Sequence, residues 1–171
     1  KRPRAVSTVT DCRVLWPPDV PGAGCECSVC VTADSHNKGT LTIQRALDQV
    51  RAIGGTVCLG TGVYHLGTTP VHIVDARSIR MKGQGWKTLL MYAGSGSAIT
   101  IERSIGVTME EMTLVTADDP SPAVSLQNWN VEVTLQRCFL RRHGSKGSTS
   151  PAVGLSGVLV GTRICENVIL A

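Results

Sequence analysis

The cysteines are the first residues of this sequence that could do chemistry. Three of them, Cys25, Cys27 and Cys30, lie within six residues, and Cys12 lies a little upstream. Four thiolates gathered at one point suit tetrahedral Zn²⁺, which binds cysteine sulfur at about 2.3 Å. His36 can substitute for Cys12. With four protein ligands, such a zinc site would be closed to water and structural in role.

Two alternatives to zinc stay open for these cysteines, namely two disulfides in a secreted protein or unmodified thiols. The chain has seven cysteines, an odd number. Cys58, Cys138 and Cys165 fall in strand-like segments, where cysteine behaves as a small apolar residue. Cys138 and Cys165 are 27 residues apart, so we expect both in one interior column, with a disulfide between neighbouring coils as the alternative. Buried thiols and the odd total favour zinc.

A second group of reactive side chains lies in two polar turns, ADDPSP and RRHGSKGSTSP. A glycoside hydrolase needs two carboxylates at a set separation. A lyase needs carboxylates for Ca²⁺ and a base. Asp and Pro favour turns on their own account, so these are weak catalytic candidates. They are Asp118, Asp119, Arg142, His143 and Lys146.

The elements that must position these residues repeat along the chain. The composition is 42% apolar but only 4% aromatic, with 18 glycines, which favours many short strands and tight turns. Steps of 28, 25 and 29 residues separate Ile73, Ile101, Leu126 and Leu155. A second series has steps of 28, 24 and 27 residues and runs through Met81, Met109, Val133 and Val160. Repeats of this length with three strands predict a parallel β-helix rather than an antiparallel sandwich.

One helix is predicted, over residues 42–53. Thr42 can cap it, Gly54 can end it, and the apolar residues from Ile43 to Ile53 recur at helical spacing. Residues 1–39 hold prolines, glycines and four of the cysteines, so we expect an irregular segment that needs a cross-link. The predicted organisation is therefore an irregular, metal-pinned segment over 1–39, and a capping helix with β-helix coils over 40–171.

Several stretches resemble the pectate-lyase-like superfamily of right-handed parallel β-helices. They are LTIQRALDQVRAIGGTVCLGTGVYHL, SIRMKGQGWKTLLMYAGSGSAITI, SIGVTMEEMTLVT and NVEVTLQRCFL. Together with the Cys-rich lead-in, the first stretch is similar to uncharacterised bacterial β-helix-repeat proteins. The resemblance implies three short strands per coil, an N-terminal capping helix, and an outer face that binds or cleaves polysaccharide.

Strand alternation indicates which side chains form that outer face. His72, Thr100 and Ser125 should point outward in one ladder, the predicted ligand face. Trp86 and Trp129 could be sugar platforms, although we expect them to pack at corners. Glu110 and Glu111 are expected to form a solvated turn.

The sequence therefore predicts a structural or binding module of a larger bacterial protein, which presents a stacked face to a glycan or a protein. The alternatives are a lyase or hydrolase acting on an acidic polysaccharide, and a rigid rod of a coat or spike. Whether the chain is an enzyme stays open. Because a β-helix leaves its last coil uncovered, we expect other parts of a longer protein, or a partner, to cover residues 160–171.

Charge and segment length bear on partners and location. The net charge of +4 permits an anionic partner without demanding one. We expect no nucleic-acid partner. We also expect no membrane partner, because no segment approaches the roughly 18 apolar residues of a membrane span. The first residues, KRPRAVSTV, lack the apolar stretch of a signal peptide. This slightly favours a cytoplasmic origin and leaves an extracellular one open.

Overall fold

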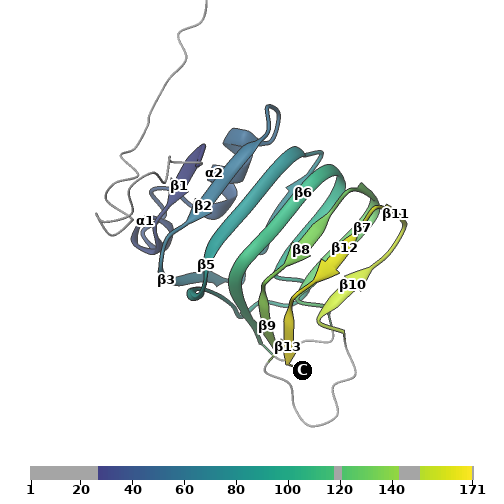
Figure 1. Cartoon of the computed structure of the whole chain (residues 1–171). Coiled ribbons are helices and arrows are strands. Elements are labelled where there is room, and N and C mark those ends of the chain that lie inside the picture. The colour runs from purple at the N-terminus through teal and green to yellow at the C-terminus, as the bar shows by residue number, and fades with distance from the viewer. Residues whose placement is uncertain (1–26, 118–120, 143–150, 171) are drawn as a thin grey trace, which may run out of the picture.

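The computed structural model describes residues 27–117, 121–142 and 151–170. They form a right-handed parallel β-helix of about five coils (Figure 1). The helices are α1 (Ala33–Asn37) and α2 (Ile43–Val50). The strands are β1 (Val29–Val31), β2 (Gly55–Leu59), β3 (Gly62–Gly67), β4 (Val71–Val74), β5 (Arg77–Tyr92), β6 (Ile99–Thr116), β7 (Val124–Val131), β8 (Thr134–Gln136), β9 (Phe139–Arg142), β10 (Val153–Leu155), β11 (Val158–Val160), β12 (Arg163–Cys165) and β13 (Val168–Leu170).

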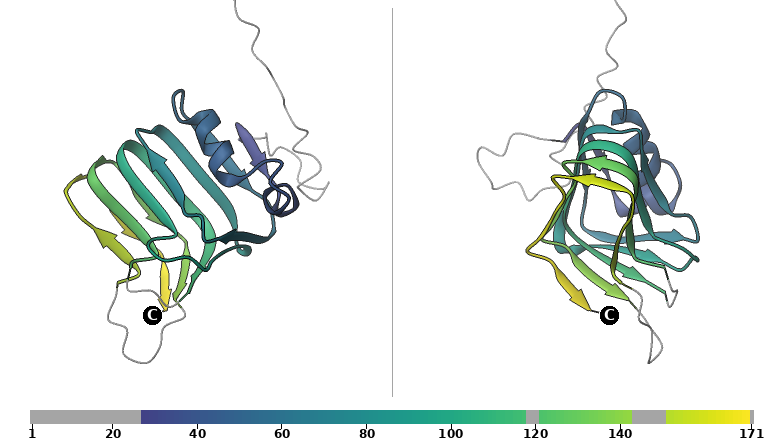
Figure 2. Two further views of the ribbon diagram at one scale, coloured as in Figure 1. Left: turned by 180° about the vertical axis from the view of Figure 1, so that it is seen from behind. Right: turned by 90° about the vertical axis from the view of Figure 1, so that its right-hand side faces the viewer.

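Each coil contributes a strand to three parallel ladders, and the long strands β5 and β6 turn a corner to serve more than one of them. The first repeat series is confirmed, since Ile73, Ile101, Leu126 and Leu155 are aligned from coil to coil. The coils stack side by side, and the C-terminal coil lies at the end opposite α2 (Figure 2).

The second repeat series is wrong after its first step. Met81 does pair with Met109, but Met109 then pairs with Leu135 and not with Val133. The cause is a register shift at the corner between Glu102 and Ser104. These residues are two apart in β6, whereas their partners in β7, Gln127 and Asn130, are three apart. One extra residue therefore offsets everything that follows.

Left-handed backbone recurs at the corners of successive coils. Positive φ angles occur at Asp75, Arg103, Asn128 and Gly157, and again at Glu111, Arg137 and Glu166. This conformation costs a non-glycine residue about 1–2 kcal/mol. Contacts between coils offset the cost, as where Arg103 Nε donates to Asp75 Oδ1 at 2.8 Å.

The interior is aliphatic, with polar side chains only where a corner needs them. Ile99, Ile101 and Val107 are completely or almost completely buried. At the corners, side chains of one coil accept hydrogen bonds from the backbone of the coil before it. Ser104 N–H donates to Asn130 Oδ1 at 3.2 Å, for example. Such bonds satisfy backbone groups that no strand can reach.

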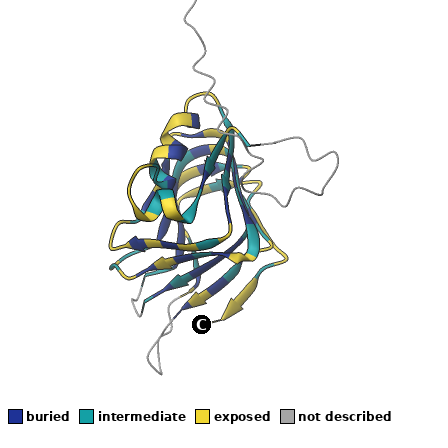
Figure 3. Ribbon diagram, turned by 90° about the vertical axis from the view of Figure 1, so that its left-hand side faces the viewer, coloured by how far each residue is buried: buried dark blue, intermediate teal, exposed yellow. Residues whose placement is uncertain are grey.

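Helix α2 covers the open end of the first coil, as predicted. Thr42 is its N-cap, and the buried residues lie on the side that faces the coils (Figure 3). They are Ile43, Ala46, Leu47 and Val50. Ile53, expected on the same stripe, is 85% exposed because the helix ends at Val50. None of the described helices is long and apolar enough to cross a membrane.

Two side-chain amides complete the edge of the first coil. Asn37 Nδ2 donates to Val63 O at 2.8 Å and Asn37 Oδ1 accepts from His65 N–H at 2.9 Å. Gln44 makes the same pair of contacts with the N–H and C=O of His72, at 2.8 and 2.9 Å. Each amide thus occupies the place of a neighbouring strand and blocks pairing at this edge.

Residues 29–37 differ from expectation, since they form β1 and α1 where the sequence predicts an irregular segment. β1 extends the sheet by pairing with β2. Thr32 and Ser35 form a capping box at the start of α1. The pattern Thr-x-x-Ser was the available signal, and it is weaker than the usual Ser/Thr-x-x-Glu.

Candidate functional site

The predicted ligand face exists as a ladder but is not open along its length. The register aligns His72, Thr100, Ser125 and Gly154. His72 is exposed, whereas Thr100 and Ser125 are only 7% and 5% exposed. Gln127 Nε2 donates to Ser125 Oγ at 2.9 Å, so the chain itself covers part of this surface. We call His72, Thr100 and Ser125 the polar outer face.

The predicted catalytic group is not assembled by the described residues. Asp118, Asp119, His143 and Lys146 lie outside them. Arg142 is described, and it is only 6% exposed at the end of β9. Strand alternation turns its side chain inward, beside the buried Leu140. The lyase and hydrolase interpretations therefore stay predictions.

The cysteines differ from expectation at Cys27 and Cys58. These two form a disulfide with Cα atoms 5.6 Å apart. Cys58 was expected as a buried thiol and Cys27 as a zinc ligand, and a sulfur in a disulfide is no thiolate ligand. The pairing arises because the parallel register of β1 with β2 brings Cys58 close to the residues around Cys27. Cys12 and Cys25 lie outside the described residues, so zinc binding itself stays a prediction.

The expected interior column of Cys138 and Cys165 is wrong. Cys165 pairs with Gln136, and it is Asn167 that lies beside Cys138, donating no sulfur contact but accepting from Cys138 N–H at 2.8 Å. The offset has the same origin as the failed second repeat series. Cys165 is exposed, while burial raises the pKa of Cys138 to about 11. Cys138 therefore stays a protonated structural thiol.

His36, the proposed substitute ligand, uses both ring nitrogens within the chain. Nδ1 accepts from Ile43 N–H at 3.1 Å, and Nε2 lies 3.3 Å from His65 O. A neutral ring with its proton on Nε2 satisfies both contacts, and burial lowers the pKa of His36. The residue ties the two helices to β3 and offers no nitrogen to a metal in this arrangement.

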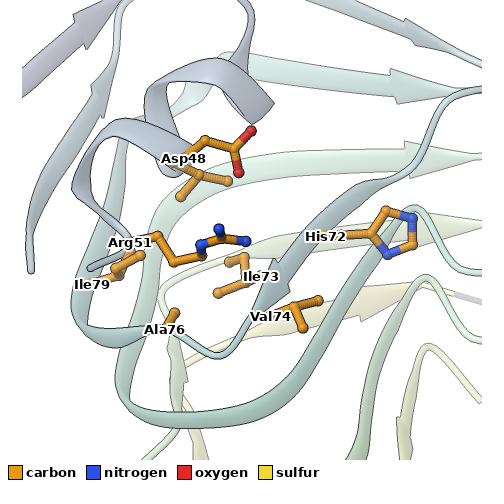
Figure 4. Close-up of a pocket in the computed structure, with 8 residues that line it drawn as sticks. Asp48, Arg51, His72, Ile73, Val74, Ala76 and Ile79 are labelled. Atoms are coloured by element: carbon orange, nitrogen blue, oxygen red, sulfur yellow. The ribbon is translucent and has the colours of Figure 1, made fainter.

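A hollow lies between α2 and β4 (Figure 4). Asp48 and Arg51 reach it from α2 and its C-cap, and Arg51 extends over Ile73 while His72 turns its ring away. The hollow encloses about 150 Å³, against about 300–1,000 Å³ for sites that bury a small molecule. It is too small to enclose such a ligand.

Glu110 is the most constrained charged group among the described residues. The sequence predicts a solvated turn here, but its carboxylate is fully buried beneath the ladder's outer side chains. Arg80 contacts Oε1, while Gln136 and Arg137 donate to Oε2 at 2.7 and 2.9 Å. Burial acts to raise the pKa of Glu110, but these hydrogen bonds and the two guanidinium charges outweigh it, so the pKa lies below its usual value. An ionised carboxylate held in this way suits a structural role and not proton donation.

The charge network continues along the adjacent corner. Arg137 Nε donates to Glu111 Oε1 at 3.1 Å, and Arg137 Nη1 lies 3.7 Å from Glu166. Lys82 lies 3.9 Å from Glu111. These charges stack on consecutive coils and neutralise one another, so the network cross-links the coils.

A third outer surface is apolar, which the sequence analysis did not single out. The ladder that joins β3, β5, β6, β9 and β13 is apolar on its inner side, as at Tyr64, Leu90 and Leu114. Its outer positions are apolar as well. We call Val63, Leu89, Met91, Val115 and Phe139 the apolar outer face.

Exposure distinguishes this surface from the core. Val63 and Met91 are 37% and 41% exposed, and Leu89, Val115 and Phe139 are half-buried. The signal was present in the sequence, because TLLMY and MTLVT are nearly continuous apolar runs. Such runs are typical of strands that are covered on both faces.

Trp86 lies in β5 just before this face, on a bulge. Gly85 pairs with Met112 and Leu89 with Thr113, so residues 86–88 have no partner in β6. Buried Thr88 anchors the bulge, since its hydroxyl donates to Gly60 O at 3.0 Å and accepts from Gln84 N–H at 2.9 Å. Trp86 is 79% exposed, with Lys87 Nζ 5.9 Å from its ring centroid. Packing at the corner, the expected role, is therefore wrong.

Comparisons with known proteins add little beyond the fold. The chain matches no protein-family model, and no curated protein sequence is significantly similar to it. One similar solved structure is that of "a putative glycosyl hydrolase from Parabacteroides merdae", with 12% identity and a TM-score of 0.45 over 82% of this chain and 95% of the other. We base no functional argument on this likeness. Membership of the pectate-lyase-like superfamily stays a prediction.

Proposed function

We propose that the chain is a β-helix binding module that docks a protein partner on its apolar outer face. The observation that carries the proposal is the chemistry of the face formed by Val63, Leu89, Met91, Val115 and Phe139. A strand normally alternates apolar and polar residues when one side meets water. These strands do not, so their outer side is suited to a second covering layer.

The composition of the face favours a protein over a glycan. Its side chains are aliphatic or aromatic and offer few hydrogen-bond donors or acceptors, whereas sugars present many hydroxyl groups. Methionine and aromatic residues are enriched where proteins meet. Trp86 at the border matches the large exposed anchors that carry much of the energy in such interfaces.

Site-specific photo-crosslinking in the cells that make the protein tests this. A photo-reactive residue replaces Met91 in one variant and Gln127, beside the polar outer face, in a matched control. We expect one protein to be captured at position 91 and not at position 127. Equal capture at both positions, capture only of this chain's own residues, or no capture would contradict the proposal.

A purified complex then gives the magnitude. Met91→Lys should weaken the captured partner's binding at least tenfold, or about 1.4 kcal/mol, while unfolding stays within about 0.5 kcal/mol of wild type. A glycan whose binding depends on Trp86, with no dependence on Met91, would favour the glycan-binding alternative instead.

A further inference from the structure

Three cysteines at the start of the described chain form a group that the proposed binding face does not use. Cys27 and Cys58 share a disulfide. Cys30 lies three residues after Cys27, in β1, and carries a thiol. All three side chains are partly accessible to solvent.

The strand register brings Cys30 next to this disulfide. Parallel pairing of β1 with β2 places Cys30 directly opposite Cys58. Val31 and Val57, their neighbours along the strands, are fully buried, so by alternation both cysteines face outward.

The spacing lets Cys58 bond to either cysteine. Paired residues of neighbouring strands lie about 4.7–4.9 Å apart, inside the range of roughly 4.4–6.8 Å between Cα atoms that a disulfide requires. The Cα atoms of Cys27 and Cys58 are 5.6 Å apart. Cys58 therefore has two cysteines within reach, and Cys27 holds the bond.

We propose that Cys27, Cys30 and Cys58 form a thiol–disulfide exchange site. The thiolate of Cys30 attacks Cys58 Sγ, a Cys30–Cys58 bond forms, and the Cys27–Cys58 bond breaks. Cys27 leaves as a thiolate and takes up a proton. The number of disulfides is unchanged, so the step consumes neither oxidant nor reductant.

The exchange moves the cross-link without disturbing the ladder. In the present state it ties the residue before Ser28 to β2; after exchange it joins two strands that are already paired. Ser28 N–H donates to Thr56 O at 2.8 Å and Ser28 Oγ accepts from Thr56 N–H at 3.0 Å. These bonds hold the start of β1 in both states. The product therefore keeps the fold and presents Cys27 as a new thiol.

Disulfide mapping of the full chain tests the proposal. Because burial raises the pKa of Cys30, the protein is incubated in buffer of about pH 9, above the ordinary thiol pKa of ~8.5. It is then acidified, alkylated and cleaved after Glu26, which separates Cys25 from Cys27. We expect a Cys30–Cys58 peptide that grows with time, together with alkylated Cys27. Cys30→Ser should retain only Cys27–Cys58, with an unchanged circular dichroism spectrum.

A second variant keeps the proposal falsifiable if Cys30→Ser does not fold. Cys27→Ser leaves Cys30 and Cys58, which should form a disulfide on incubation with oxidised glutathione. The proposal is overturned if these two remain thiols there, or if Cys27 in the wild-type chain never becomes alkylated. A link from Cys58 to Cys12 or Cys25 in place of Cys30 would overturn it as well.

Discussion

The polar and apolar outer faces belong to the same set of coils and carry opposite chemistry. Their inner positions are alike, since Ile73 and Leu90 are both buried aliphatic residues. Outside, His72 and Ser125 alternate with the core residues of their strands, whereas Leu89 and Met91 continue the apolar run. The core needs only one apolar side of each strand. The second apolar side therefore points to a function outside the core.

Accessibility reverses the expectation that polarity marks the site. The polar outer face was the predicted ligand surface, yet Thr100 and Ser125 are almost fully covered. The apolar outer face remains reachable at Val63 and Met91. A surface that is costly to expose and still accessible is the better candidate for an interface.

The largest expected effect separates the inner from the outer side of one strand. Leu90→Ala removes a side chain that is fully buried, and should lower the free energy of unfolding by about 2–5 kcal/mol. Met91→Ala, at the next position on the apolar outer face, should cost about 0.5 kcal/mol or less. Urea denaturation of both variants measures the difference. Similar losses would mean that Met91 is covered within the folded chain.

The next effect concerns the charged ladder that separates the coils' other outer surfaces. Glu110→Gln removes the charge that Arg80 and Arg137 contact, and should cost about 1–3 kcal/mol at neutral pH. Glu111→Gln is the matched control; its carboxylate is partly exposed, so about 0–1 kcal/mol is expected.

The same pair of variants gives a pH test. Because the pKa of Glu110 is lower in the folded chain than its usual value, the unfolded chain binds more protons as the pH falls. The stabilisation is therefore present above the usual pKa of ~4.3 and is lost as the pH drops through the folded value. Glu110→Gln should flatten the fall in melting temperature below about pH 5. An unchanged slope would show that Glu110 is not the group responsible.

A smaller effect tests how the first coil is completed before either outer face begins. Gln44→Ala removes both contacts to the His72 backbone and Asn37→Ala removes those to Val63 and His65. Each should cost about 1 kcal/mol. Hydrogen exchange should quicken at the His72 amide in the first variant and at the His65 amide in the second. Exchange that speeds equally at both amides would indicate general loosening instead of local caps.

Sequence reasoning predicted the fold because the coil repeats its chemistry in register. The aligned Ile73, Ile101 and Leu126 and the capping stripe of α2 follow from periodicity alone. The second series failed at one extra residue in the β7 corner. A corner insertion leaves no periodic signal, so Leu135 took the place expected for Val133.

The candidate site was harder to predict because polar residues drew the attention. His72 and Ser125 looked functional by type, whereas the apolar run around Met91 was taken only as strand evidence. Burial of Glu110 depends on Arg80, Gln136 and Arg137 from neighbouring coils, about 26–30 residues away in sequence. The Cys27–Cys58 disulfide likewise depends on the pairing of β1 with β2, a strand that the sequence analysis left irregular.

The smallest expected effect isolates the two faces from stability altogether. Val63→Ser and His72→Ser each change one exposed outer side chain, so both should unfold within about 0.5 kcal/mol of wild type. Only Val63→Ser removes accessible apolar area from the apolar outer face, and only it should elute earlier from a hydrophobic-interaction column. Equal elution shifts would show that the two faces present similar apolar surface to solvent. The contrast on which the proposed interface rests would then disappear, even though both variants remained folded.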